Sequence, residues 1–195
     1  MANMKVGTRL SLGFGLVLVL LMLVALLGVF NMSTIHAKLE RIVNENTLKT
    51  ELVNNMSNSV HIVARVSRSV VLLSEPAAIR AELEKVGKAR EAYNKAVEQL
   101  AHLPATPKGL EIRERIAAQA RVTRPLNDKV FELALADQDA EATAVLMKQS
   151  GPATQVWQDA MDEYAALQKQ TNQADAAAAG ALGGVVGLAA QLAQQ

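Results

Sequence analysis

The chain has 195 residues, of which 50% are hydrophobic, 20% charged and 3% aromatic, and its formal net charge is +1. A charge so close to zero does not suggest a nucleic-acid partner. The absence of cysteine excludes disulfides, thiol catalysis and thiolate metal sites. Few aromatic, glycine and proline residues, and no sustained alternation of apolar and polar residues, predict an all-α protein.

An uncharged apolar run over residues 10–30 is long enough to cross a membrane, because about 20 helical residues span roughly 30 Å. Lys5 and Arg9 precede it, so the positive-inside rule places residues 1–9 in the cytoplasm and the following domain outside. A cleaved signal peptide is the alternative, but its apolar region usually has only about 7–15 residues and ends at a small-residue cleavage site. We therefore expect an uncleaved membrane anchor.

Four helical segments are predicted after this anchor. Their apolar residues recur at spacings of three and four, the pattern of helices that share a bundle core. The first three cover about residues 31–73, 76–100 and 108–136, and the polar residues 44–47 break the apolar seam of the first. The fourth begins near residue 137 and runs into the last apolar segment of the chain.

Capping and helix-breaking residues define the ends of these segments. Thr106 is a predicted N-cap, with Pro107 in the first helical position of the third segment. Pro125 is expected to kink this segment. Asp137 or a neighbour is expected to cap the fourth segment. The sequence Ser-Gly-Pro at residues 150–152 is expected to interrupt it.

Short connections make consecutive helices antiparallel neighbours. The prediction is a membrane-anchored, antiparallel up-down-up-down four-helix bundle over residues 31–175, outside the membrane. Residues 176–195 carry no charge and are rich in alanine and glycine. We expect them to form a marginal or truncated second transmembrane helix, whose small residues would let another helix approach closely. A frayed helical tail is the alternative.

The sequence contains no recognisable catalytic constellation. None of the three histidines has a second histidine at metal-ligand spacing, and no nucleotide-binding loop or nucleophile elbow is present. Glu-x-x-His does not occur, which disfavours a di-iron bundle. We therefore expect a protein that is not an enzyme and that uses neither a metal nor a cofactor.

Arg65 and Arg68 lie on the side of the first helix opposite to its apolar stripe. In a monomer this would be an ordinary solvated face. In a dimer formed through this face, both arginines from each chain would lie near a shared axis and would repel one another unless an anion lay between them. Arginine binds carboxylates through paired, charge-assisted hydrogen bonds. A small dicarboxylate is therefore the predicted class of ligand.

Other arginines and aromatic residues are weaker candidates for ligand binding. Arg121 and Arg124 form a second basic pair on the third helix and are predicted to point away from its apolar stripe, as ligand residues or as ordinary surface charge. Arg90 interrupts the apolar seam of the second helix and could extend its charged head outward. Trp157 and Tyr164 are expected to fill the core.

Three stretches resemble bacterial methyl-accepting chemotaxis proteins with four-helix-bundle sensors. They are the first apolar segment at residues 4–29, Ala-Arg-Val-Ser-Arg-Ser-Val-Val at 64–71, and Gly-Pro-Ala-Thr-Gln-Val-Trp-Gln-Asp-Ala-Met at 151–161. The second stretch is similar to the arginine-bearing stretch of aspartate-sensing receptors. The third stretch is similar to part of the last helix of their sensor domains. The resemblance implies a homodimer in the bacterial inner (cytoplasmic) membrane, with its sensor domain in the periplasm.

The resemblance also implies roles for individual residues. Arg65 and Arg68 would bind ligand carboxylates across the dimer interface, and Thr154 would lie near the ligand's amino or carboxyl end. In the aspartate receptors another arginine follows one turn later, where this chain has Leu72. An amino acid, another organic acid or no direct ligand is thus admissible. Other sensors of the family use arginines of the third helix, which keeps Arg121 and Arg124 as candidates.

Two functions from different classes follow from these observations. The first is a chemoreceptor sensor module, in which a bound ligand biases a small displacement of the fourth helix against the first across the membrane. The second is a membrane-anchored structural or interaction protein that dimerises, or docks a periplasmic partner, without a small ligand. No linker or cytoplasmic coiled coil of the chemotaxis family follows Gln195, so we expect a fragment, a truncated product or a stand-alone relative.

Overall fold

The structure is a computed structural model that describes Gly7, residues 14–23, 25–26, Ser33 and 45–192, the last eleven of these by their backbone alone. Contacts divide the chain into two units. One is residues 45–171, and the other combines residues 1–44 with 172–195. The first unit contains the helical bundle.

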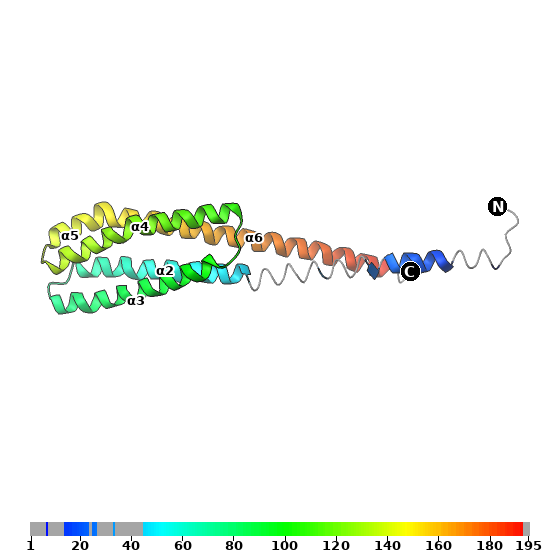
Figure 1. Cartoon of the computed structure of the whole chain (residues 1–195), viewed down its shortest axis with the longest axis horizontal. Coiled ribbons are helices and arrows are strands. Elements are labelled where there is room, and N and C mark those ends of the chain that lie inside the picture. The colour runs from blue at the N-terminus through cyan, green and yellow to red at the C-terminus, as the bar shows by residue number, and fades with distance from the viewer. Residues whose placement is uncertain (1–6, 8–13, 24, 27–32, 34–44, 193–195) are drawn as a thin grey trace. The chain divides into compact units, whose positions relative to one another are not determined.

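Every element assigned between residues 45 and 192 is helical, which confirms the predicted all-α class. Figure 1 shows α2, α3, α4 and the stretch from α5 into α6 side by side as the four members of a bundle. Connections of only a few residues join them, as the sequence predicted. In chain order the elements are α2 (Thr47–Val70), α3 (Pro76–Ala101), α4 (Pro107–Leu135), α5 (Asp139–Val145), the π-helical turn η2 (Leu146–Ser150) and α6 (Gly151–Leu192).

Two clusters of buried side chains hold the bundle together. One joins α2, α3, α4 and α6, and the other joins α2, α3, α4, α5 and η2. Trp157 and Tyr164 lie in the first cluster, as predicted, with 3% and 0% of their surface exposed. Fully burying a large apolar side chain contributes about 1.5–3 kcal/mol. The clusters therefore fix which face each helix turns outward.

The two ends of α4 follow the sequence prediction in different degrees. Thr106 caps its beginning, because its Oγ1 accepts a hydrogen bond from the Gly109 N–H at 3.1 Å. Of the two alternatives for the cap of the next helix, Asp137 or a neighbour, the structure has the neighbour, because Gln138 is the N-cap of α5, without a side-chain capping bond. Asp137 itself takes the left-handed conformation, with φ of 59°. The Gln138 N–H bonds to Leu133 O at 2.9 Å, which is the helix-terminating pattern that a left-handed residue allows.

The predicted interruption at residues 150–152 is also wrong. The backbone passes from α5 into α6 without a break, through the π-helical turn η2. The N–H of Gly151 bonds to the carbonyl of Leu146, five residues earlier. A π turn accommodates one extra residue in the helix. The position following it must be small, because a Cβ on Gly151 would lie 2.9 Å from that same Leu146 oxygen.

The predicted membrane segments are only partly described. Residues 10–13, 24 and 27–30 lie outside the described residues, whereas 14–23 and 25–26 are helical with exposed large apolar side chains. Residues 176–192 form the end of α6. Across the parts of the chain that the structure describes, no helix is both long and apolar enough to span a bilayer. The boundaries at residues 9, 30 and 175 stay predictions.

Two glycine-to-alanine substitutions test the requirement of the π turn for glycine. Gly87 lies within α3, and a Cβ there would meet no atom within 4 Å. We expect Gly87→Ala to stabilise the fold by about 0.5–1 kcal/mol, because alanine loses less backbone entropy in a helix. Gly151→Ala should destabilise it by about 1–3 kcal/mol, the usual cost of forcing extra atoms into a packed site. Urea denaturation followed by circular dichroism measures both. Equal effects in the two variants would contradict this account of Gly151.

Candidate functional site

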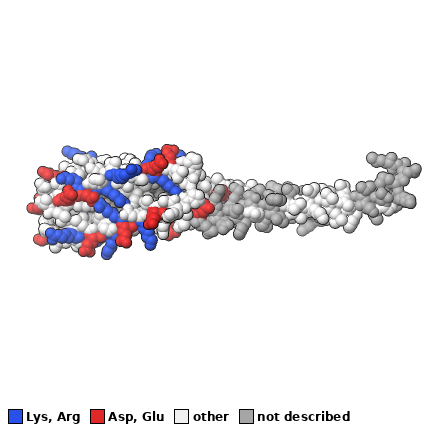
Figure 2. Space-filling model, in the orientation of Figure 1, with Lys and Arg blue, Asp and Glu red and all other residues white. Residues whose placement is uncertain are grey.

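Charge on the bundle surface does not by itself mark a site. Figure 2 shows Lys and Arg side chains interleaved with Asp and Glu over the face that it draws. Several of these charges form ion pairs, such as Arg115 with Glu163 and Lys108 with Glu111. Hollows between the helices are more informative, because small-molecule sites are concave. The three grooves described next contain Arg65, Arg68, Arg121 and Arg124, which the sequence singled out.

The α2–α6 groove has a volume of about 280 Å³ and brings Arg68 together with Thr154. These residues are far apart in sequence, and both were implied by the resemblance to chemotaxis receptors. Arg68 is exposed and makes no hydrogen bond or ion pair within the described part of the chain. Thr154 is buried, with 6% of its surface exposed. The groove therefore contains both an unneutralised cation and a hydroxyl group.

The π turn helps to shape the α2–α6 groove. Leu146, Ser150 and Gly151 contribute to its lining together with Gln158. The Oγ of Ser150 donates to Asn127 Oδ1 at 2.5 Å, and this buried bond ties the turn to α4. Beside the groove, a hydrogen bond of 2.8 Å joins Gln158 Nε2 to His61 Nδ1 and links α6 to α2. The π turn is thus bonded to α4, and α6 is bonded to α2 beside the groove.

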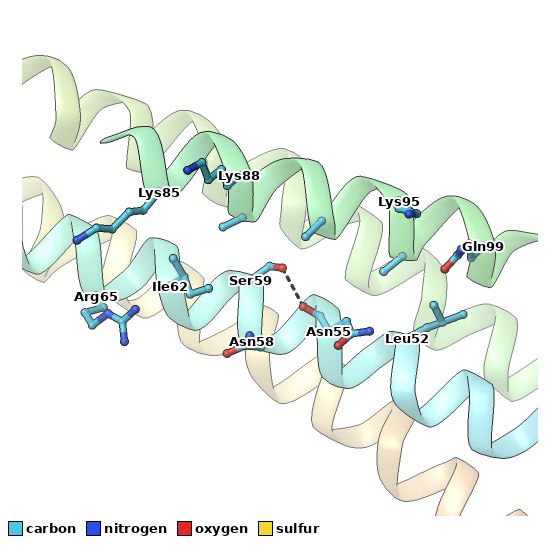
Figure 3. Close-up of a pocket in the computed structure, with 13 residues that line it drawn as sticks. Leu52, Asn55, Asn58, Ser59, Ile62, Arg65, Lys85, Lys88, Lys95 and Gln99 are labelled. Atoms are coloured by element: carbon cyan, nitrogen blue, oxygen red, sulfur yellow. Dashed lines mark hydrogen bonds between the residues drawn. The ribbon is translucent and has the colours of Figure 1, made fainter. Parts of the chain in front are cut away.

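Arg65 lies in a different groove from Arg68. The α2–α3 groove has a volume of about 580 Å³, and Arg65 lines it with three lysines of α3. Figure 3 shows Arg65 reaching toward the end of the groove where Lys85 lies. Within one chain the two arginines therefore do not converge on one hollow. The predicted arrangement around a dimer axis is not tested by a single chain.

Arg121 and Arg124 both line the α3–α4 groove, which has a volume of about 550 Å³. Arg121 is exposed, and its Nε donates to Ala117 O at 3.3 Å. The sequence predicted that Arg124 points away from the apolar stripe of its helix. In the structure it instead packs against α3. Its guanidinium lies 5.0 Å from the centre of the Tyr93 ring, and one of its terminal nitrogens donates to Asn94 Oδ1 at 2.8 Å. Burial lowers the pKa of Arg124, the neighbouring Arg90 lowers it further, and Tyr93 and Asp128 act in the opposite direction.

Two further arginines serve the fold. Arg90 extends to α4, where it donates to Asp128 Oδ1 at 2.6 Å. Arg113 was not singled out from the sequence, yet its Nε and one terminal nitrogen donate to the Tyr164 hydroxyl at 3.0 and 2.7 Å. Its other terminal nitrogen donates to Leu103 O at 3.0 Å. Their hydrogen bonds hold the bundle together, so Arg90 and Arg113 are poor candidates for ligand binding.

Sequence reasoning also missed the three lysines of the α2–α3 groove. Lys85, Lys88 and Lys95 lie on the same stretch of α3 as the alanines at 89, 92 and 96. A helical wheel of α3 places these positions on one side, which is the signal that could have found them. No group of three or more histidine, cysteine, aspartate or glutamate residues that could hold a metal was found among the described residues.

By its fold, the protein is a helical bundle with solvent-facing grooves between its helices. Comparison with known sequences then identifies the family. A family described as a four helix bundle sensory module for signal transduction matches residues 3–181, and the chain belongs to this family. It is therefore a sensory module for signal transduction.

A comparison with solved structures found chains of similar fold, one of which is informative here. It is described as "Periplasmic sensor domain of sensor histidine kinase", and it matches with a TM-score of 0.60 and 18% sequence identity. The match covers 73% of this chain and 92% of the other. At this identity the likeness establishes the fold alone. A search of curated proteins found no significant match.

Tyr93 provides a pH-dependent test of the core beneath these grooves. Its side chain is buried, and burial raises its pKa to about 12, although the hydrogen bond from Trp157 and the charge of Arg124 oppose the shift. The folded pKa exceeds the ordinary value near 10, so the stabilisation by the protonated hydroxyl is complete below about pH 10 and is lost as the pH rises through 12. We expect the loss to be about 3 kcal/mol, at about 1.4 kcal/mol per pKa unit.

Absorbance at alkaline pH measures this ionisation, because the chain has only two tyrosines. We expect Tyr93→Phe to remove the component that titrates near pH 12. The same variant should lose less unfolding free energy than the wild type between pH 10 and 12. An unchanged titration in Tyr93→Phe would refute the assignment.

Proposed function

We propose that this sensory module detects a small organic acid, such as an amino acid or a dicarboxylate, in the α2–α6 groove. The observation that carries the proposal is the pairing of Arg68 with Thr154 in one hollow. Arg68 has no internal partner within the described residues, so its guanidinium is available for a carboxylate. Paired hydrogen bonds to a planar carboxylate are the interaction that guanidinium forms best.

The chemistry of the groove favours binding over catalysis. Its lining includes a cation, hydroxyl groups and side-chain amides, and contains no carboxylate, histidine or lysine among the described residues. A nucleophile with an adjacent base, which covalent or acid–base catalysis would need, is not among these residues. We therefore propose a binding module rather than an enzyme, one that acts without a metal or cofactor.

The position of the groove suggests how binding would be communicated. The ligand would contact α2 through Arg68 and α6 through Thr154, and α6 continues as one helix from Gly151 to Leu192. A ligand that binds one arrangement of the two helices more tightly shifts the population toward that arrangement. Membership of the sensory family, and a similar fold in a sensor domain described as periplasmic, support a periplasmic location. We propose that the module is a homodimer anchored in the inner membrane and that it serves chemotaxis.

Replacing Arg68 tests the proposed site directly. A hydrogen bond to a charged group contributes about 1.5–3 kcal/mol, so Arg68→Ala should weaken carboxylate binding by roughly 10- to 150-fold. Titration calorimetry of the full chain with aspartate, succinate and malate measures this loss. Arg80→Ala is the matched control, since Arg80 is an exposed arginine of α3 outside the groove. Stability should change by less than about 0.5 kcal/mol in either variant.

Two outcomes would contradict the proposal. Unchanged affinity in Arg68→Ala, together with a large loss in Arg121→Ala, would move the site to the α3–α4 groove. No binding of any of these acids by the wild type would favour the alternative of an interaction protein that dimerises or docks a partner without a small ligand.

A further inference from the structure

The α2–α3 groove has two chemically different parts, a cationic rim and an apolar floor. The rim consists of Arg65 from α2 and Lys85, Lys88 and Lys95 from α3, and no carboxylate among the described residues lines the groove. All four cations are exposed to solvent. Lys85 pairs with Glu82 one turn earlier, whereas the other three make no hydrogen bond or ion pair within the described residues. Three of the four rim cations, Arg65, Lys88 and Lys95, therefore have no neutralising partner among the described residues.

Small side chains create the hollow between the cations. Ala89, Ala92 and Ala96 lie along the α3 side, and Leu52 and Ile62 lie on the α2 side. Ser59 adds little polarity, because its hydroxyl donates to the Asn55 carbonyl at 2.8 Å, as Figure 3 shows. Leu52, Ala89 and Ala96 are buried members of the bundle. The floor thus offers apolar surface to an occupant, beside the side-chain amides of Asn55, Asn58 and Gln99, which also line the groove.

The cations are distributed along the length of the groove. Figure 3 shows Arg65 and Lys85 toward one end and Lys95 toward the other, close to Gln99. Lys85 and Lys95 are ten residues apart in one helix, which corresponds to about 15 Å along its axis. A compact anion could contact only one end at a time. An occupant that satisfies both ends must be elongated, with a charge at each end and an apolar middle.

We propose that the α2–α3 groove binds an unbranched dicarboxylate whose apolar chain reaches from the Arg65–Lys85 end to Lys95. The carboxylates pair with the cations, and the chain covers the alanine floor. The volume of about 580 Å³ lies within the range of about 300–1,000 Å³ that is usual for small-molecule sites. This site shares no lining residue with the α2–α6 groove. The inference therefore stands independently of the proposed function.

A series of dicarboxylates of increasing length tests this two-ended site. Titration calorimetry of the full chain, both as the wild type and as Arg68→Ala, would compare succinate, adipate, suberate and sebacate, with decanoate as the singly charged counterpart of sebacate. The Arg68→Ala variant removes short acids from the α2–α6 groove, so the dependence on chain length is taken from that variant. Each methylene that leaves water should raise the affinity by about two- to fourfold. Sebacate should bind about fivefold more tightly than decanoate, because an exposed ion pair contributes up to about that factor. Added salt should weaken this preference.

Two substitutions separate the roles of the ends and the floor. Lys95→Gln should reduce sebacate binding to the level of decanoate and leave succinate unaffected. Lys129→Gln, an exposed lysine of α4 outside the groove, is its matched control. Ala92 is exposed, so Ala92→Leu should fold normally, fill the hollow and abolish the dependence on chain length.

Three results would overturn the proposal. The first is an affinity that does not depend on chain length. The second is an equal effect of Lys95→Gln on succinate and sebacate, which would indicate non-specific attraction by positive charge. The third is the loss of sebacate binding in Arg68→Ala, which would place the ligand in the α2–α6 groove. In the proposed two-site arrangement, Arg68→Ala leaves sebacate binding unchanged, so the two hypotheses fail separately.

Discussion

The π-helical turn at Leu146–Ser150 determines how the fourth member of the bundle meets the other three. Buried residues follow one another at intervals of four through this region, at Ala142, Leu146, Ser150 and Thr154. In a regular α-helix each such interval rotates the side chain by about 40° around the axis, so the face would soon turn away from the core. The wider turn cancels much of this drift. Thr154, after the turn, lines the α2–α6 groove, and Trp157 lies in the buried cluster that joins α2, α3, α4 and α6.

The arginines of the bundle fall into two groups, those that bond to other residues of the bundle and those that do not. Arg90, Arg113 and Arg124 use their guanidinium groups within the bundle, on Asp128, on the Tyr164 hydroxyl and on the Tyr93 ring. Arg65 and Arg68 have no such partners among the described residues. This difference matters more than exposure alone, because a cation already engaged in a bond must lose that bond before it can hold a ligand. The free arginines are therefore the stronger candidates for recognition.

The grooves between the helices follow from the size of side chains as much as from their charge. Alanines on α3 leave the α2–α3 groove open, and the glycine required by the π turn contributes to the α2–α6 groove. Both hollows lie against α2, whose two free arginines enter different grooves. This sensory module thus presents two chemically distinct hollows on either side of one helix, one with a single arginine beside hydroxyl and amide groups and the other with four cations along its length.

The sequence by itself determined the all-α class, both ends of α3 and of α4 to within one residue, the Thr106 cap and the burial of Trp157 and Tyr164. These features depend on local periodicity and on capping chemistry, which neighbouring residues carry. Tertiary structure alone decided that Arg124 packs on Tyr93 and that residues 150–152 continue a helix after a π turn bonded to α4. It also separated Arg65 from Arg68. A helical wheel gives the direction of a side chain from its own axis, but which hollow or ring it meets depends on neighbouring helices that are distant in the chain.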